Sequence, residues 1–113
     1  ARVNCTCCFT TSQLTLAAAA GARYVSFFYN RAMDSGENEF NTLADTSKFI
    51  VQNVLNCEII AGSIRTPKNI TDAWSHGAHI VTAGYDVIKE STTHPGTQAS
   101  VDQFLTDFKE WIN

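Results

Sequence analysis

The sequence lacks clusters of basic residues, long apolar runs and a metal-type spacing of cysteines. Its 8 Lys and Arg residues are outnumbered by 11 Asp and Glu, so the formal net charge is −3. Because a phosphate backbone calls for clustered cations, we expect no nucleic-acid partner. No apolar run approaches the roughly 18 residues of a membrane-spanning helix, and no charged-then-apolar segment opens the chain. We therefore expect a cytoplasmic protein with no membrane partner.

Cysteines are few and unevenly placed. Of the 4 in the chain, three lie in "NCTCCF" (residues 4–9) and the last is Cys57. Zinc sites combine two C-x-x-C pairs, or one pair with two suitably spaced histidines, and disulfide scaffolds are far denser in cysteine. We therefore predict no metal, no cofactor and no disulfide framework. The cysteines are interpreted as small buried side chains of a reduced, intracellular protein.

A length of 113 residues, with 44% hydrophobic and 17% charged residues, is typical of one globular domain or part of one. The chain starts at Ala1 without Met and enters an apolar strand almost at once. This suggests a chain that begins in mid-fold, and we treat residues 1–113 as a single partial domain.

Strand and helix signals alternate along the chain. Apolar, β-compatible runs predict four strands, at residues 3–9, 22–30, 57–63 and 78–84. Capping residues and helical periodicity predict helices at residues 10–21, 39–55 and 66–77, the last with Thr66 as cap and Pro67 in its first turn. The remaining segments are expected to be a polar loop at 31–38, a short helix at 85–94, and an amphipathic helix at 100–113 with a capping box of Ser100 and Gln103.

This alternation with short connections predicts parallel strands joined by right-handed crossovers. Residues 17–26 and 73–82 share a helix-Gly-strand pattern and are offset by 56 residues. The pattern indicates either a true internal repeat or a helix-to-strand turn of a kind common to all α/β proteins.

Polar residues close the predicted strands, where ligands bind in parallel α/β folds. Alternation puts several of them on one face of the sheet: Asn4 and Thr6 in the first strand, and Ser26, Phe28 and Asn30 in the second. Cys5 and Cys7 are predicted to lie on the opposite face, against the covering helices.

Two arginines directly follow strands. Arg31 follows the second strand, while Arg65 follows the third, which ends at Ser63. Two cations and a hydroxyl at one rim suit a phosphate monoester. The alternative is that each arginine pairs with a nearby acid such as Asp34 or Glu37.

Four motifs, "NCTCCFTTSQ", "AAAAGARYVSFFYNR", "AGSIRTPKNI" and "GYDVIKESTTHPG", resemble the second half of the small transaldolase and fructose-6-phosphate aldolase family. The resemblance covers nearly the whole chain and implies half of a TIM (β/α)8 barrel, equivalent to barrel strands five to eight plus terminal helices. It also implies class I aldolase chemistry on sugar phosphates of the pentose phosphate pathway, through a Schiff-base lysine. By resemblance, active-site positions are matched by Asn4, Thr6, Ser26 and Phe28, and the phosphate cradle by Arg31, Ser63 and Arg65.

The sequence also departs from the family pattern. Phe27 stands where the family usually has Pro, and Met33 where the next loop usually has Asp. The family's Schiff-base lysine belongs to the fourth barrel strand, upstream of this sequence. An imine-forming lysine needs burial or a cationic neighbour, and solvated helix positions are predicted for all four lysines: Lys48, Lys68, Lys89 and Lys109. We therefore expect this chain alone to be inactive.

Three functions remain open on the sequence. The first is a partial transaldolase-type enzyme that carries the phosphate-binding half of the site. The second is a non-catalytic sugar-phosphate-binding half-barrel that functions only as an oligomer. The third is a doubly wound domain of flavodoxin type, although no Gly-rich loop follows the first strand.

Half a barrel would leave two strand edges and an inner face uncovered, so we expect a homo-oligomer. Two copies can close edge to edge into an eight-stranded barrel with two-fold symmetry. The final helix offers a second route, because it carries an apolar stripe: Phe104, Leu105, Phe108, Trp111 and Ile112.

Overall fold

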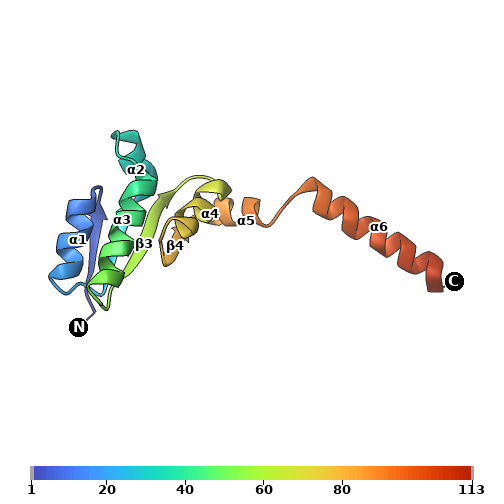
Figure 1. Cartoon of the computed structure of the whole chain (residues 1–113). Helices are drawn as coiled ribbons and strands as arrows, with labels where there is room; N and C mark the ends of the chain where they lie inside the picture. Colours follow the sequence, from blue (N-terminus) through green and yellow to red (C-terminus); the bar gives the residue numbers. More distant parts are fainter. Residues whose placement is uncertain (1, 113) are drawn as a thin grey trace.

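Four parallel strands form one sheet in the computed structural model, which describes residues 2–112 (Figure 1). The strands lie side by side in chain order: Asn4–Cys8 (β1), Tyr24–Phe28 (β2), Glu58–Ile64 (β3) and Ile80–Ala83 (β4). The helices are Thr11–Ala19 (α1), Tyr29–Asp34 (α2), Glu39–Gln52 (α3), Pro67–Ser75 (α4), Tyr85–Ser91 (α5) and Pro95–Ile112 (α6). All three strand pairs are parallel, as the alternation of strands and helices predicts.

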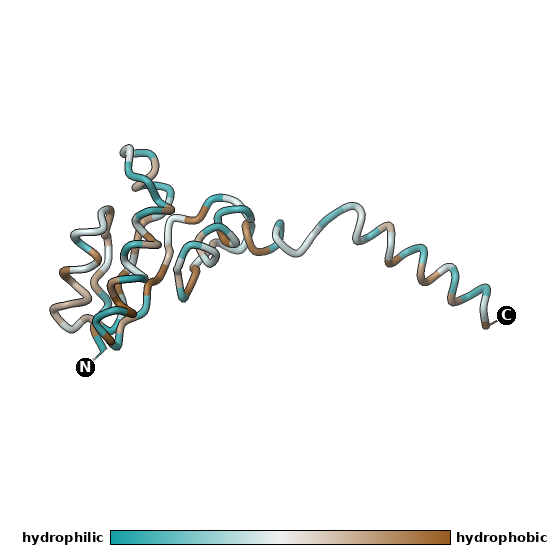
Figure 2. Tube along the Cα trace, in the orientation of Figure 1, coloured by the Kyte–Doolittle hydropathy of each residue, from teal (hydrophilic) through white to brown (hydrophobic). Residues whose placement is uncertain are grey.

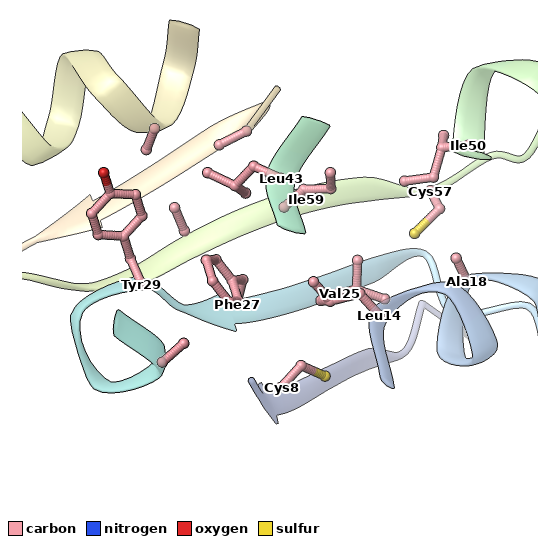
Figure 3. Packing of buried hydrophobic residues seen from close by; sticks show 14 of the residues in the cluster. Cys8, Leu14, Ala18, Val25, Phe27, Tyr29, Leu43, Ile50, Cys57 and Ile59 are labelled. Carbon is pink, nitrogen blue, oxygen red and sulfur yellow. The ribbon is translucent and has the colours of Figure 1, made fainter. Parts of the chain in front are cut away.

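One face of the sheet packs against α1, α3 and α4. Val25, Phe27 and Ile59 of the strands are fully buried and lie beside Leu14 of α1 and Leu43 of α3 (Figure 3). Burying each such side chain stabilises the fold by about 1.5–3 kcal/mol. Phe27 is therefore a core residue.

The start of α4 follows the sequence signals. The Thr66 side chain accepts a hydrogen bond from the Asn69 backbone N–H at 3.2 Å, and the Asn69 side chain accepts one from the Thr66 N–H at 3.1 Å. Pro67 occupies the first helical position, where its missing N–H is harmless. The predicted cap is confirmed.

A single β-α-β unit recurs in the backbone with an offset of 56 residues. Helix α1 covers residues 11–19 and helix α4 covers residues 67–75, so the two helices have the same length and lie 56 residues apart. β3 and β4 flank α4 at nearly the same spacing as β1 and β2 flank α1. Three pairs of special residues share this offset: left-handed Cys7 and Ser63, N-caps Thr10 and Thr66, and left-handed Gly21 and Gly77. The structure therefore favours a true internal repeat over the alternative that two helix-to-strand turns merely look alike.

A bulge in β1 corrects the prediction for one cysteine. Cys7 has a φ of 63°, and the register with β2 shifts between Cys5 and Cys8. The extra residue leaves Cys7 exposed and puts Cys8, opposite Phe27, in the buried position that strict alternation assigns to Cys7. Burial is confirmed for Cys8 and Cys57, is partial for Cys5, and is wrong for Cys7.

Helix α2 lies partly where a loop was predicted. The second strand ends at Phe28 rather than at Asn30, and residues 29–34 are helical. Tyr29 and Ala32, three residues apart, are both buried. Because residues three apart share a helix face, the core stabilises this turn more than the polar sequence suggests.

The last helix begins earlier than predicted and stands away from the sheet (Figure 1). It starts at Pro95, and Nδ1 of His94 accepts a hydrogen bond from the Gly96 N–H at 2.9 Å. Ser100 therefore lies inside the helix, and the predicted capping box of Ser100 and Gln103 is wrong.

Helix α6 contributes no buried residue. Its apolar residues recur along the helix (Figure 2), and Phe104 and Trp111 are 70% and 84% exposed. Across residues 2–112, no helix combines the length and apolar character needed to cross a membrane.

Candidate functional site

Two predicted site residues meet on the face of the sheet that the helices leave uncovered. Ser26 Oγ of β2 donates a 2.8 Å hydrogen bond to Asn4 Oδ1 of β1. Ser26 is 5% exposed, whereas Asn4 and Thr6 are exposed. The bond uses Asn4 Oδ1 and leaves the Asn4 amide nitrogen free to donate, while the Thr6 side chain is exposed.

Phe28 lies two residues beyond Ser26 in β2 and pairs with Gly62 of β3. A Cβ built on Gly62 would lie 3.6 Å from Thr82 Oγ1 and 3.8 Å from Phe28 Cδ1. The Phe28 ring also packs against Phe9, with 6.2 Å between ring centroids. These neighbours define the floor of the inner face, and Thr82 is a member that the sequence reasoning missed.

The two arginines approach the same short helix. Arg31 belongs to α2, and its guanidinium lies 5.3 Å from the centroid of the Phe28 ring. Arg65 Nη2 lies 2.7 Å from Asp34 Oδ2 in the last turn of α2, with both side chains about half exposed (52% and 55%). Arg65 therefore pairs with a nearby acid, which is the alternative to phosphate binding given by the sequence. An exposed pair of this kind contributes only about 0–1 kcal/mol, so a phosphate can compete for the arginine.

A buried asparagine fixes the end of β3 and the turn into α4, the segment that carries Ser63 and Arg65. Asn30 is 3% exposed, and its Nδ2 donates to the Ser63 carbonyl at 2.6 Å and to Asn69 Oδ1 at 2.8 Å. Asn69 Oδ1 also accepts from the backbone N–H groups of Arg65 and Thr66 at 3.2 and 3.1 Å. Sequence reasoning put Asn30 on a strand face and did not find this role.

Ser63 itself has a φ of 58° at a bulge in β3. L-residues adopt this region rarely, and such positions cluster at ligand sites. Here the bond from Asn30 to the Ser63 carbonyl helps to hold the conformation.

The buried thiols are unsuited to nucleophilic chemistry. Burial, assisted by neighbouring Cys5, raises the pKa of Cys8 from 9.0 to about 11. Burial also raises the pKa of Cys57 above its ordinary value. Both side chains remain neutral thiols near pH 7, whereas the thiolate is the reactive form. Among residues 2–112, no three His, Cys, Asp or Glu side chains converge as metal ligands would.

All four lysines are exposed on helices, as predicted: Lys48 on α3, Lys68 on α4, Lys89 on α5 and Lys109 on α6. Lys68 pairs with Asp72, with 2.7 Å between Nζ and Oδ2. None of these lysines belongs to a strand of the described sheet.

A parallel β/α sheet with polar and cationic side chains at the strand ends is the arrangement of a β/α protein that binds ligands at its carboxyl rim. Comparison with known proteins gives the family. The family model "Transaldolase/Fructose-6-phosphate aldolase" matches residues 1–112. The chain belongs to this family.

The chain spans about half the length of the curated relatives it matches. A probable transaldolase of Geobacillus sp. (strain WCH70) is 40% identical over 107 residues, covering 95% of this chain and 50% of the relative. A probable transaldolase of Clostridium acetobutylicum is 38% identical over 112 residues, covering 99% and 52%. The four parallel strands and this coverage fit half of a (β/α)8 barrel, as the sequence predicts.

A solved structure of a mandelate oxidase variant with (S)-mandelic acid aligns with a TM-score of 0.56 at 19% identity. The alignment covers 74% of this chain and 25% of that chain. At this identity the likeness concerns the β/α fold alone.

Proposed function

We propose that this chain carries the sugar-phosphate-binding half of a transaldolase-type class I aldolase site, acting in cytoplasmic sugar-phosphate metabolism. The observation that carries the proposal is the rim of β2 and β3, where Arg65 reaches the helix that bears Arg31. Guanidinium groups suit phosphate because they donate paired, charge-assisted hydrogen bonds. Family membership supports the same ligand class.

In this proposal Arg31, Ser63 and Arg65 bind the phosphate. Arg65 leaves Asp34 when the ligand arrives, because phosphate carries more negative charge than the carboxylate and their existing pair is exposed. Asn30 and Asn69 position the end of β3 and Arg65 through the bonds described above.

Asn4, Thr6, Ser26 and Phe28 face the carbon chain of the substrate. Ser26 orients the Asn4 amide by donating to Oδ1, which leaves Asn4 Nδ2 free to donate to a hydroxyl or carbonyl oxygen. Phe28 supplies an apolar wall opposite Gly62. These residues bind and orient, and none of them can form an imine.

The amine for a Schiff base must come from outside the described strands. Lys48, Lys68, Lys89 and Lys109 lie on solvated helix surfaces, and an imine-forming lysine requires a desolvated or cationic setting. The exposed lysines equally support the alternative function, a non-catalytic sugar-phosphate-binding half-barrel that works only as an oligomer.

Isothermal titration with inorganic phosphate and with fructose 6-phosphate tests the proposal. The Arg31→Ala, Arg65→Ala double variant should bind about 100-fold or more weakly, since each charge-assisted bond contributes about 1.5–3 kcal/mol. Arg2→Ala is the matched control, because Arg2 precedes β1 and lies at the amino end of the sheet. Equal affinity in the wild type and the double variant would contradict the assignment.

A further inference from the structure

Cys5 and Cys8 lie on the same face of the sheet, with the bulge of β1 between them. Cys8 is 3% exposed and belongs to the core, and Cys5 is partly buried and packs against the same core. In a regular strand, residues three apart point to opposite faces. The left-handed residue Cys7 adds the extra step that returns Cys8 to the face of Cys5.

The bulge also shortens the distance between these two cysteines. Cys5 lies opposite Val25 of β2, and Cys8 lies opposite Phe27. Three steps along β1 therefore advance only as far as two steps along β2, which is about 6.6 Å rather than about 10 Å. Disulfides join Cα atoms that lie up to about 6.8 Å apart. The backbone thus brings the pair within the range of a disulfide.

The second unit of the repeat has the same geometry inside the sheet. Ala61 and Ile64, the equivalents of the cysteine pair, flank the bulge at Ser63 and lie opposite Val81 and Ala83 of β4. Ala61 is fully buried, and Ile64 packs against the same core. Because β3 has a neighbouring strand on both sides, this arrangement does not depend on an open edge of the sheet.

The Cys8 side chain turns back toward Cys5. Its Sγ lies 3.8 Å from the Cys5 carbonyl oxygen. Burial is the main cause that raises the pKa of Cys8, and the charge of Cys5 and a side-chain hydrogen bond with it add to this rise. The two thiols are therefore close neighbours. For Cys57, the charges that act on the thiol are those of Arg23 and Glu58.

We propose that Cys5 and Cys8 form a reversible disulfide, which makes the bulge of β1 a redox-sensitive site. The oxidant is a low-molecular-weight disulfide such as glutathione disulfide. The Cys5 thiolate attacks one of its sulfurs, so a mixed disulfide forms and one glutathione leaves as a thiolate. Cys8 then loses its proton and attacks the Cys5 sulfur, which releases the second glutathione. Two electrons and two protons pass from the protein to glutathione.

The disulfide would enclose Thr6, which the proposed function places against the carbon chain of the substrate. The disulfide itself is independent of that function, whereas its effect on the substrate rests on it. Bond formation brings the two Cα atoms toward the common separation of about 5.5–6 Å, so Thr6 must shift. We expect fructose 6-phosphate to bind about twofold to tenfold more weakly, which corresponds to the loss of one hydrogen bond.

Binding of inorganic phosphate should not change on oxidation. The residues assigned to it are Arg31 on α2, Ser63 on β3 and Arg65 in the turn after β3. None of them belongs to β1, so a shift of Thr6 leaves them in place.

Mass spectrometry of the native chain tests the disulfide. After incubation with glutathione disulfide and alkylation of the remaining thiols, the peptide with Cys5 and Cys8 should have lost two hydrogen atoms. Cys57 should be alkylated, and dithiothreitol should reverse the change. Because the pKa of Cys8 is about 11, closure should accelerate about tenfold per pH unit from about pH 7 to about pH 10, as the thiolate fraction rises. Absence of a bond between Cys5 and Cys8 overturns the proposal.

Two variants identify the partners. Cys7→Ser keeps the proposed pair and should oxidise as the native chain does, whereas Cys5→Ser should form no internal disulfide. A bond that uses Cys7 in the native chain, or an internal bond in Cys5→Ser, contradicts the pairing. If Cys5→Ser does not fold, fragmentation of the oxidised Cys7→Ser peptide still decides between the partners.

Titration of reduced and oxidised Cys7→Ser separates the disulfide from its effect on the substrate. Weaker binding of fructose 6-phosphate with unchanged binding of inorganic phosphate is the expected result. Equal affinity of both forms for fructose 6-phosphate contradicts the shift of Thr6. If neither form binds fructose 6-phosphate, the proposed function fails, while the mass measurement still decides whether the disulfide forms.

Discussion

Nδ2 of Asn30 lies 2.8 Å from Oδ1 of Asn69 and 2.6 Å from the carbonyl oxygen of Ser63. These two hydrogen bonds connect α2 to the start of α4 and to the end of β3. One buried amide therefore connects both strand ends that carry the arginines. Because amides hold this geometry without charge, the arrangement is independent of pH near neutrality.

Removing Asn69 should destabilise the protein more than removing its repeat equivalent. Asn69→Ala leaves the 3%-exposed Asn30 amide without one partner and removes the acceptor for the Arg65 and Thr66 backbone N–H groups, so we expect a loss of about 2–4 kcal/mol. Gln13→Ala is the matched control, because Gln13 accepts only from the exposed Phe9 N–H, and about 1 kcal/mol is expected. Urea unfolding measures both, and equal losses would contradict the role assigned to Asn69.

Phosphate affinity should rise when Asp34 is neutralised. Asp34→Asn removes the carboxylate that pairs with Arg65 at 2.7 Å. Phosphate binding then no longer carries the free-energy cost of breaking this ion pair. We expect about a twofold to fivefold gain, since an exposed pair contributes about 0–1 kcal/mol. Titration with inorganic phosphate gives the answer, with Asp72→Asn on α4, the partner of Lys68, as the control. Unchanged or weaker binding in Asp34→Asn would place the phosphate elsewhere.

Gly77→Ala should be more harmful than Gly36→Ala. Both glycines have positive φ, at 122° and 95°, so both variants gain backbone strain of about 1–3 kcal/mol. Only Gly77 also brings a new Cβ to 2.7 Å from Ser47 Cβ, while Gly36 has nothing within 4 Å. Thermal unfolding should show that Gly77→Ala lowers the free energy of unfolding by at least about 1 kcal/mol more than Gly36→Ala does. Equal losses would mean that α3 can shift away from the new Cβ at little cost.

No lysine of the isolated chain should form a Schiff base. All four are exposed on helices, which lack the burial or cationic neighbour that an imine-forming amine requires. Borohydride reduction in the presence of dihydroxyacetone, followed by mass spectrometry, should leave the mass unchanged. A stoichiometric adduct on one lysine would show that the chain carries its own nucleophile.

Stability should fall as the pH rises from about 9 toward 11. The pKa of Cys8 is about 11 in the folded protein against an ordinary 9.0, so the unfolded chain loses this proton first, and this deprotonation stabilises the unfolded state as the pH rises. The stabilisation is complete below pH 9 and is lost as the pH passes the folded value. Chemical unfolding across this range should show a shallower slope for Cys8→Ala, and an unchanged slope would contradict the burial effect.

Local signals predicted much of the fold, because they depend on neighbouring residues. Thr66 and Pro67 define a helix start through their own chemistry, and the four apolar runs became the four strands. The bulges at Cys7 and Ser63 could not be predicted, since a left-handed residue depends on the turn that follows. Strict alternation therefore assigned Cys7 to the wrong face.

The sequence predicted which residues belong to the candidate site better than it predicted the contacts between them. Asn4 and Ser26 were expected on one face and are hydrogen-bonded there. Asn30 bonds a carbonyl 33 residues away, and no local pattern encodes such a contact. Arg65 pairs with Asp34, one of the two acids that spacing alone had offered.

Equal backbones with unequal side chains are what duplication of one ancestral unit, followed by divergence, produces. Phe9 and Arg65 occupy matching positions after their bulges, and each backbone N–H is held by the third residue of the next helix, Gln13 or Asn69. One unit thus presents an aromatic ring where the other presents a cation. The two units therefore share the main chain at this rim and differ in their side chains, so charge can be moved from one unit to the other without redesigning the backbone.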